Sequence, residues 1–125
     1  MNKKEFSTIK DITDAKFKDF EKTYKGVRQI AIPIGDVDQD ELNLDSDTKE
    51  AQFVICKPDR KVLNAVARYG ADKNYGKANQ VLVTNCVLGG DMEWLEEGRD
   101  DDIYMAVIDE IGKLVNTKKA RLVKR

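Results

Sequence analysis

The spacing of apolar residues changes along this chain, and that change limits the folds that the chain can adopt. Up to Gly26, aromatic residues recur at helical spacing, which predicts a helix over residues 1–25. From Val27 the period becomes two, because isoleucines occupy alternate positions, and this predicts a half-buried strand over residues 27–34. A chain that carries both periods is expected to fold as α+β.

A second β-rich run, residues 50–57, ends at Pro58 and is expected to pair with residues 27–34 as a hairpin. Residues 35–50 contain seven acidic residues against one lysine and predict a loop. Pro33 cannot donate a ladder hydrogen bond, so the first strand should lie at a sheet edge or end there. Since two strands alone are marginal in water, helices must pack on them or further strands must join.

The second half of the chain is expected to contain about three helices. The first spans about residues 58–69 and ends at Gly70, and the last covers residues 103–115, with acids before it and lysines after it. Residues 77–88 fit a buried helix, with a buried strand as the alternative, and Gly89-Gly90 should end either one. The helix is preferred because an i, i+4 row is kept by Ala78, Leu82 and Cys86.

Length favours a single domain, and the balance of charges predicts no strong overall electrostatic field. A chain of 125 residues with 41% hydrophobic content can close one core, expected over residues 1–117, and residues 118–125 form a basic tail. The 22 basic and 23 acidic residues nearly cancel, so the whole molecule is not expected to be drawn to nucleic acid or to a bilayer.

Several features favour a cytoplasmic protein. The longest wholly apolar run is six residues, 103–108, far shorter than a membrane span, so no span is expected, and the first residues lack the pattern of a signal peptide. Cys56 and Cys86 both lie in apolar stretches and are expected to be buried thiols that react slowly.

No catalytic, cofactor-binding or metal-binding residue is predicted. The chain has no histidine, which removes the commonest general base, the commonest metal ligand and every Ser-His or Cys-His pair. Two cysteines without histidine cannot form a four-ligand zinc site of thiolate and imidazole, and no phosphate-binding glycine loop is present. The chain is therefore expected not to be an enzyme.

Two acidic segments are candidates for a cation-binding or catalytic site. Asp36, Asp38, Asp40 and Asp47 have the spacing of a calcium loop, but Glu41 stands where that loop needs glycine, so a solvated loop is expected. The seven acids within residues 91–102 are likewise expected to be solvated rather than to supply a catalytic carboxylate pair.

The candidate partner-binding residues lie around this second acidic segment and on the last helix. Trp94 is either an anchor for a partner or part of a helical turn that folds onto the core. The apolar stripe of the last helix is a structural or docking element, and Ile108 and Ile111 on this stripe are each expected to be largely buried. The candidates are Trp94, Tyr104, Val107 and Ile111.

The stretch from about residue 50 to 115 resembles the tail assembly chaperones of long-tailed bacterial viruses, often found in prophages. The resemblance rests on a strand that runs into Lys57-Pro58-Asp59-Arg60, the helix after it, the apolar segment 81–87, an acidic stretch and a final amphipathic helix. It implies a cytoplasmic, non-enzymatic protein that binds the tape-measure protein and helps to recruit tail tube subunits, with self-association as a further possibility. Residues 1–49 depart from the helical pattern of that family.

The charged segments are also compatible with a second function. The tail contains five cations in eight residues and could contact phosphates, or an acidic face could mimic nucleic acid. The alternative is therefore a small regulatory or nucleic-acid-associated protein. Because the tail has no aromatic residue and cannot stack on bases, nucleic acid is the less favoured partner.

Overall fold

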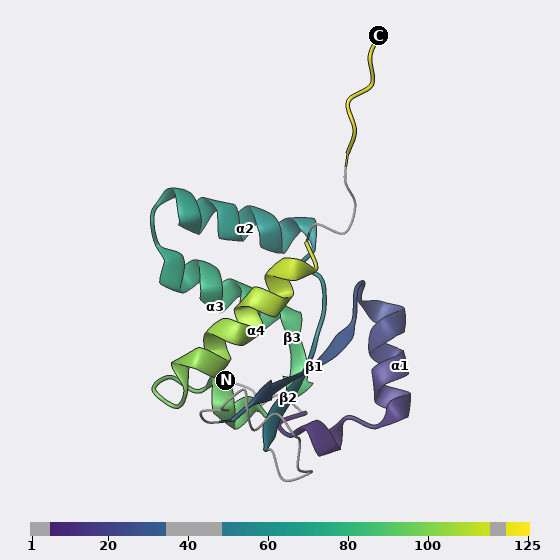
Figure 1. Ribbon diagram of the computed structural model, residues 1–125, viewed down its shortest axis with the longest axis vertical. Helices are drawn as coiled ribbons and strands as arrows, with labels where there is room; N and C mark the ends of the chain where they lie inside the picture. Colours follow the sequence, from purple (N-terminus) through teal and green to yellow (C-terminus); the bar gives the residue numbers. More distant parts are fainter. Residues whose placement is uncertain (1–5, 35–48, 116–119) are drawn as a thin grey trace, which may run out of the picture.

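The computed structural model describes residues 6–34, 49–115 and 120–125, and it has the expected α+β architecture (Figure 1). The elements follow in the order η1 (Ile9–Asp11), α1 (Asp14–Thr23), β1 (Arg28–Pro33), β2 (Glu50–Ile55), α2 (Arg60–Ala71), α3 (Tyr75–Cys86), β3 (Val87–Gly90), η3 (Met92–Leu95) and α4 (Asp101–Lys113). Residues 36–47, expected to form a solvated acidic loop, lie outside the described residues.

The sheet has three antiparallel strands in the order β1-β2-β3. The predicted hairpin is confirmed, since Arg28 pairs with Ile55 and Pro33 with Glu50. Pro33 lies on an edge strand, where its missing N–H costs no ladder hydrogen bond. The third strand supplies the additional pairing that an isolated hairpin needs.

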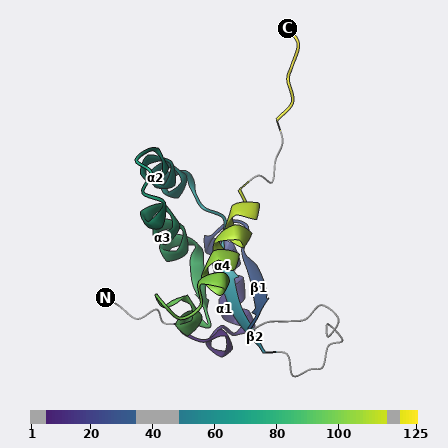
Figure 2. The same cartoon turned by 60° about the vertical axis from the view of Figure 1, so that its left-hand side comes forward.

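The central strand β2 is covered on both faces, and its sequence reflects this. Figures 1 and 2 place α1 and α4 on opposite sides of the sheet. In β2, Phe53, Val54 and Ile55 are all buried, so apolar residues follow one another and do not alternate with polar ones. The edge strand β1 alternates instead between half-buried isoleucines and exposed residues, because one of its faces remains in contact with solvent.

The N-terminal helix is shorter than predicted. In place of one helix over residues 1–25, the described part contains η1 and then α1. The break lies at Ile12, which is extended, and α1 starts afresh because the Thr13 hydroxyl accepts a hydrogen bond from the Lys16 N–H at 3.3 Å. This break lets residues 6–12 lie along the sheet, where the Gly90 N–H donates to the Phe6 carbonyl at 3.1 Å.

The ambiguous segment 77–88 contains both predicted alternatives. Helix α3 covers it to Cys86, and strand β3 begins at the next residue. Gly89 and Gly90 do not end the segment, as the sequence had suggested, but are themselves strand residues. A Cβ on Gly89 would lie 2.6 Å from the Cβ of Phe6, and Gly90 has a φ of 134°, so close approach and backbone conformation both require glycine here.

Helices α2 and α3 form an antiparallel pair that extends to one side of the sheet (Figures 1 and 2). Helix α2 begins where the Asp59 carboxylate accepts a hydrogen bond from the Val62 N–H at 2.9 Å. It does not end at Gly70 but continues to Ala71, and Lys73 then takes a left-handed conformation with φ 59°. No side chain of α2 is fully buried.

Candidate protein-binding surface

Trp94 lies on the turn η3 and packs against the core, which is the second of the two placements considered for it. Its side chain is half-buried, and Met92 and Leu95 of the same turn also contact the core. The Arg99 guanidinium lies 4.5 Å from the centroid of the indole ring, within the range of a cation–π interaction. A partner can therefore reach only part of the indole.

Helix α4 turns most of its predicted docking residues inward. Val107 and Ile111 are fully buried at 0% exposure, and with Ile103 they form the side of α4 that faces the core. These two residues contribute to stability and are not part of the surface. Tyr104 is half-buried, and desolvation raises the pKa of its phenol. Ile108, expected to be largely buried, is only half-buried and lies outside the core cluster.

Two of the acids predicted to be solvated have structural roles. The Asp91 carboxylate accepts hydrogen bonds from the Ile9 N–H and from the Gln52 N–H, both at 2.9 Å. It thus joins the N-terminal segment to the central strand. Asp100 caps α4 by accepting from the N–H groups of Asp102 and Ile103 at 3.1 and 3.2 Å. Neither role could be read from the local composition of the segment.

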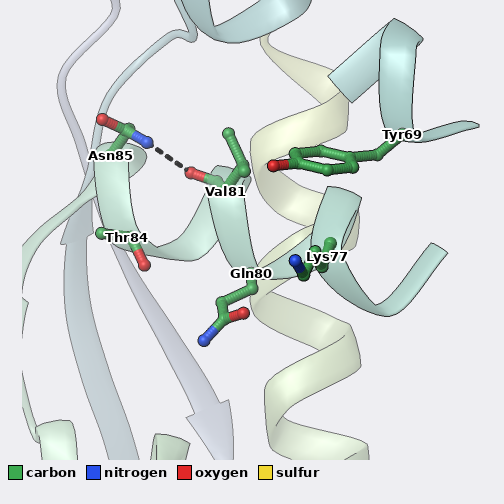
Figure 3. Close-up of a pocket in the computed structure, with 6 residues that line it drawn as sticks. All are labelled: Tyr69, Lys77, Gln80, Val81, Thr84 and Asn85. Atoms are coloured by element: carbon green, nitrogen blue, oxygen red, sulfur yellow. Dashed lines mark hydrogen bonds between the residues drawn. The ribbon is translucent and has the colours of Figure 1, made fainter. Parts of the chain in front are cut away.

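The α2–α3 pair carries an open groove that the sequence did not reveal (Figure 3). The groove has a volume of about 260 Å³ and is lined by Tyr69, Lys77, Gln80, Val81, Thr84 and Asn85. Tyr69 comes from the end of α2, and all the other lining residues come from α3. In the close-up the Tyr69 ring extends toward α3, and the Asn85 amide donates to the Val81 carbonyl at 2.8 Å.

The groove combines two half-buried apolar side chains with a polar rim that carries one charge, on Lys77. Tyr69 and Val81 are half-buried, whereas Lys77, Gln80, Thr84 and Asn85 are exposed. The Lys77 ammonium lies 5.8 Å from the centroid of the Tyr69 ring. An accessible aromatic and aliphatic pair with polar groups around it is typical of a protein-binding surface and is too open to enclose a small substrate.

The two cysteines lie where the strands meet α3. Both side chains are buried, at 3% for Cys56 and 1% for Cys86. The Cys56 N–H donates to the Cys86 carbonyl at 2.9 Å, which joins the end of β2 to the end of α3. Burial in apolar surroundings agrees with the expectation that these thiols serve as small packing residues.

Among residues 6–34, 49–115 and 120–125, no group of three or more Cys, Asp or Glu side chains is arranged to hold a metal ion. In the same part of the chain, no helix is long and apolar enough to cross a membrane.

Comparison with known proteins gives no match to a protein-family model, to a curated protein or to a solved structure.

Proposed function

We propose that this protein is a non-enzymatic assembly factor, a tail assembly chaperone that binds the helical tape-measure protein of a long-tailed bacterial virus. The order of elements in residues 50–115 supports this proposal by its resemblance to that family. The resemblance starts at the strand before Lys57-Pro58-Asp59-Arg60 and continues through to the final amphipathic helix.

The observation that carries the proposal is the incomplete burial of α2. Leu63 and Val66 are half-buried and lie outside the core cluster, and no side chain of this helix is fully buried. Helix α2 packs on α3 and leaves apolar surface exposed to solvent. Exposed apolar surface on an amphipathic helix is suited to binding a second helix, as a tape-measure protein would provide.

Co-expression with the tape-measure and tail tube proteins of one virus tests this function. We expect the tape-measure protein to remain in the soluble fraction and to co-purify with this chain through affinity and size-exclusion steps. A tape-measure protein whose solubility is the same with and without this chain, and which never co-purifies, would exclude the chaperone function.

A further inference from the structure

Charge is strongly separated between the two helical parts of the molecule. Residues 57–86, which contain α2 and α3, have six basic and two acidic residues, a net charge of +4. Residues 91–113, which contain η3 and α4, have nine acidic and two basic residues, a net charge of −7. The near-zero charge of the whole chain therefore conceals a basic α2–α3 pair.

The groove lies on this basic pair and has the shape of a strip. Its five α3 residues occur at positions i, i+3, i+4, i+7 and i+8, starting from Lys77 and ending at Asn85, so they share one face of the helix. At about 1.5 Å per residue, the strip is about 12 Å long. A strip of this kind matches two turns of a helix packed beside α3.

The lining chemistry further restricts the occupant. Tyr69 and Val81 offer apolar contact at the centre, and Lys77 offers a cation beside them. The other basic side chains of the pair that are exposed to solvent are Arg60, Lys61, Arg68 and Lys73. An occupant that carries apolar residues on one side and carboxylates on its flanks satisfies both features.

We propose that the α2–α3 groove is the docking site for an acidic amphipathic helix of the partner protein, an inference that rests on the proposed chaperone function. Apolar residues of that helix pack on Tyr69 and Val81, while its flanking carboxylates face Lys77 on a helix pair whose net charge is positive. Nucleic acid fits the groove less well, because the lining offers one half-buried aromatic ring and no arginine.

The experiment uses two synthetic amphipathic helical peptides that share one leucine stripe, with glutamate on the flanks of one and lysine on the flanks of the other. Binding to the full-length chain is measured by fluorescence anisotropy at low and high salt, and amide shifts are mapped by NMR. We expect the glutamate peptide to bind at least about tenfold more tightly than the lysine peptide at low salt. The shifted amides should cluster on α2 and α3.

Four variants locate the contact. Tyr69→Ser and Lys77→Glu should each weaken binding of the glutamate peptide by about tenfold or more. Lys22→Glu, which makes the same change of charge on an exposed residue of α1, should leave the affinity within about twofold. Circular dichroism checks that every variant keeps its fold, and Val81→Thr, a change of similar volume, serves as a second groove variant if Tyr69→Ser unfolds.

Several results would overturn the proposal. These are equal binding of the two peptides, no binding of either, shifts centred on β1 or α4, and displacement of the peptide by a DNA oligonucleotide at comparable concentration. The test separates this proposal from the chaperone function. If the tape-measure protein co-purifies equally well with the groove variants, the chaperone function stands and the groove is wrong. If the peptide binds at the groove but the tape-measure protein does not co-purify, the groove is a docking site and the chaperone function is wrong.

Discussion

At the scale of single residues, Asp91 connects parts of the chain that are far apart in sequence. Its two carboxylate oxygens accept one N–H from Ile9 and one from Gln52, and its own N–H donates to the Gln52 carbonyl at 2.8 Å. Hydrogen bonds to a charged acceptor are among the stronger ones in proteins, about 1.5–3 kcal/mol each. One side chain in an acidic segment thus holds the N-terminal segment against the central strand.

Asp91→Asn should lower the free energy of unfolding by about 1–3 kcal/mol, because the amide puts an N–H against a backbone N–H and loses the charge. Urea denaturation followed by circular dichroism measures this change. Glu97→Gln is the matched control, since Glu97 is exposed in the same segment, and it should alter stability by less than about 0.5 kcal/mol. Equal effects of the two substitutions would show that the Asp91 hydrogen bonds contribute little.

At the scale of elements, α4 shows how one apolar stripe can have two uses. The side that contains Ile103, Val107 and Ile111 is buried in the core, while Tyr104 and Ile108 beside it stay half-buried. Burial rather than spacing thus separates residues that stabilise the fold from residues that a partner can touch. The helix itself is well defined at its start, where Asp100 caps it.

Ile111→Ala should lower the free energy of unfolding by about 2–5 kcal/mol, the usual range for truncating a buried isoleucine. Ile108→Ala should cost less than about half as much, because Ile108 is half-buried and outside the core cluster. Chemical denaturation of both variants measures the difference. A loss at Ile108 as large as that at Ile111 would mean that α4 packs in a different orientation.

The elements that the sequence predicted well are those whose signals are local. The hairpin and α4 follow from alternation, helical spacing and the charges at the ends of the helix, all within a few residues. The sequence predicted a strand here only as the alternative for residues 77–88, and it did not predict that Gly89 and Gly90 belong to β3. These glycines carry no apolar side chain, and their pairing depends on Phe53 and Val54, far away in the chain. The extended segment around Ile12 was not predicted either, because hydrogen bonds to residues far away in the chain hold it in place.

The site was harder to predict than the fold. An apolar stripe on a helix looks the same whether it faces the core or a partner, so Val107 and Ile111 could not be distinguished from surface residues. Tyr69 and Val81 each fit the pattern of an ordinary core position. Only the packing of α2 on α3 brings them to one groove.

At the scale of the whole molecule, the C-terminal tail is separate from the folded body. Residues 120–125 are all exposed, and Leu122 is 99% exposed (Figure 1). The basic residues of this part are therefore available for contacts with other molecules, and its apolar residues bury no surface on the domain. Stability and any electrostatic function of the tail should be separable.

Deleting residues 118–125 should shift the melting temperature by less than about 2 °C, because few apolar contacts are lost. Differential scanning calorimetry provides the measurement. The same variant distinguishes the two proposed classes of function. Binding to a tape-measure protein should survive the deletion, whereas a salt-sensitive gel shift with DNA that disappears with the tail would favour a nucleic-acid-associated protein.

The pairing of residues 6–12 with the far end of the sheet also affects how the chain is made. The Ile9 N–H reaches a carboxylate 82 positions later, and Phe6 meets Gly90. On the ribosome, the first segment must therefore wait until the codons beyond residue 91 have been translated. Closing so long a loop carries a high entropic cost, and contacts of this range slow folding. The hairpin and the α2–α3 pair can form as soon as their own residues are made, but the sheet is completed only after Gly90 has been added.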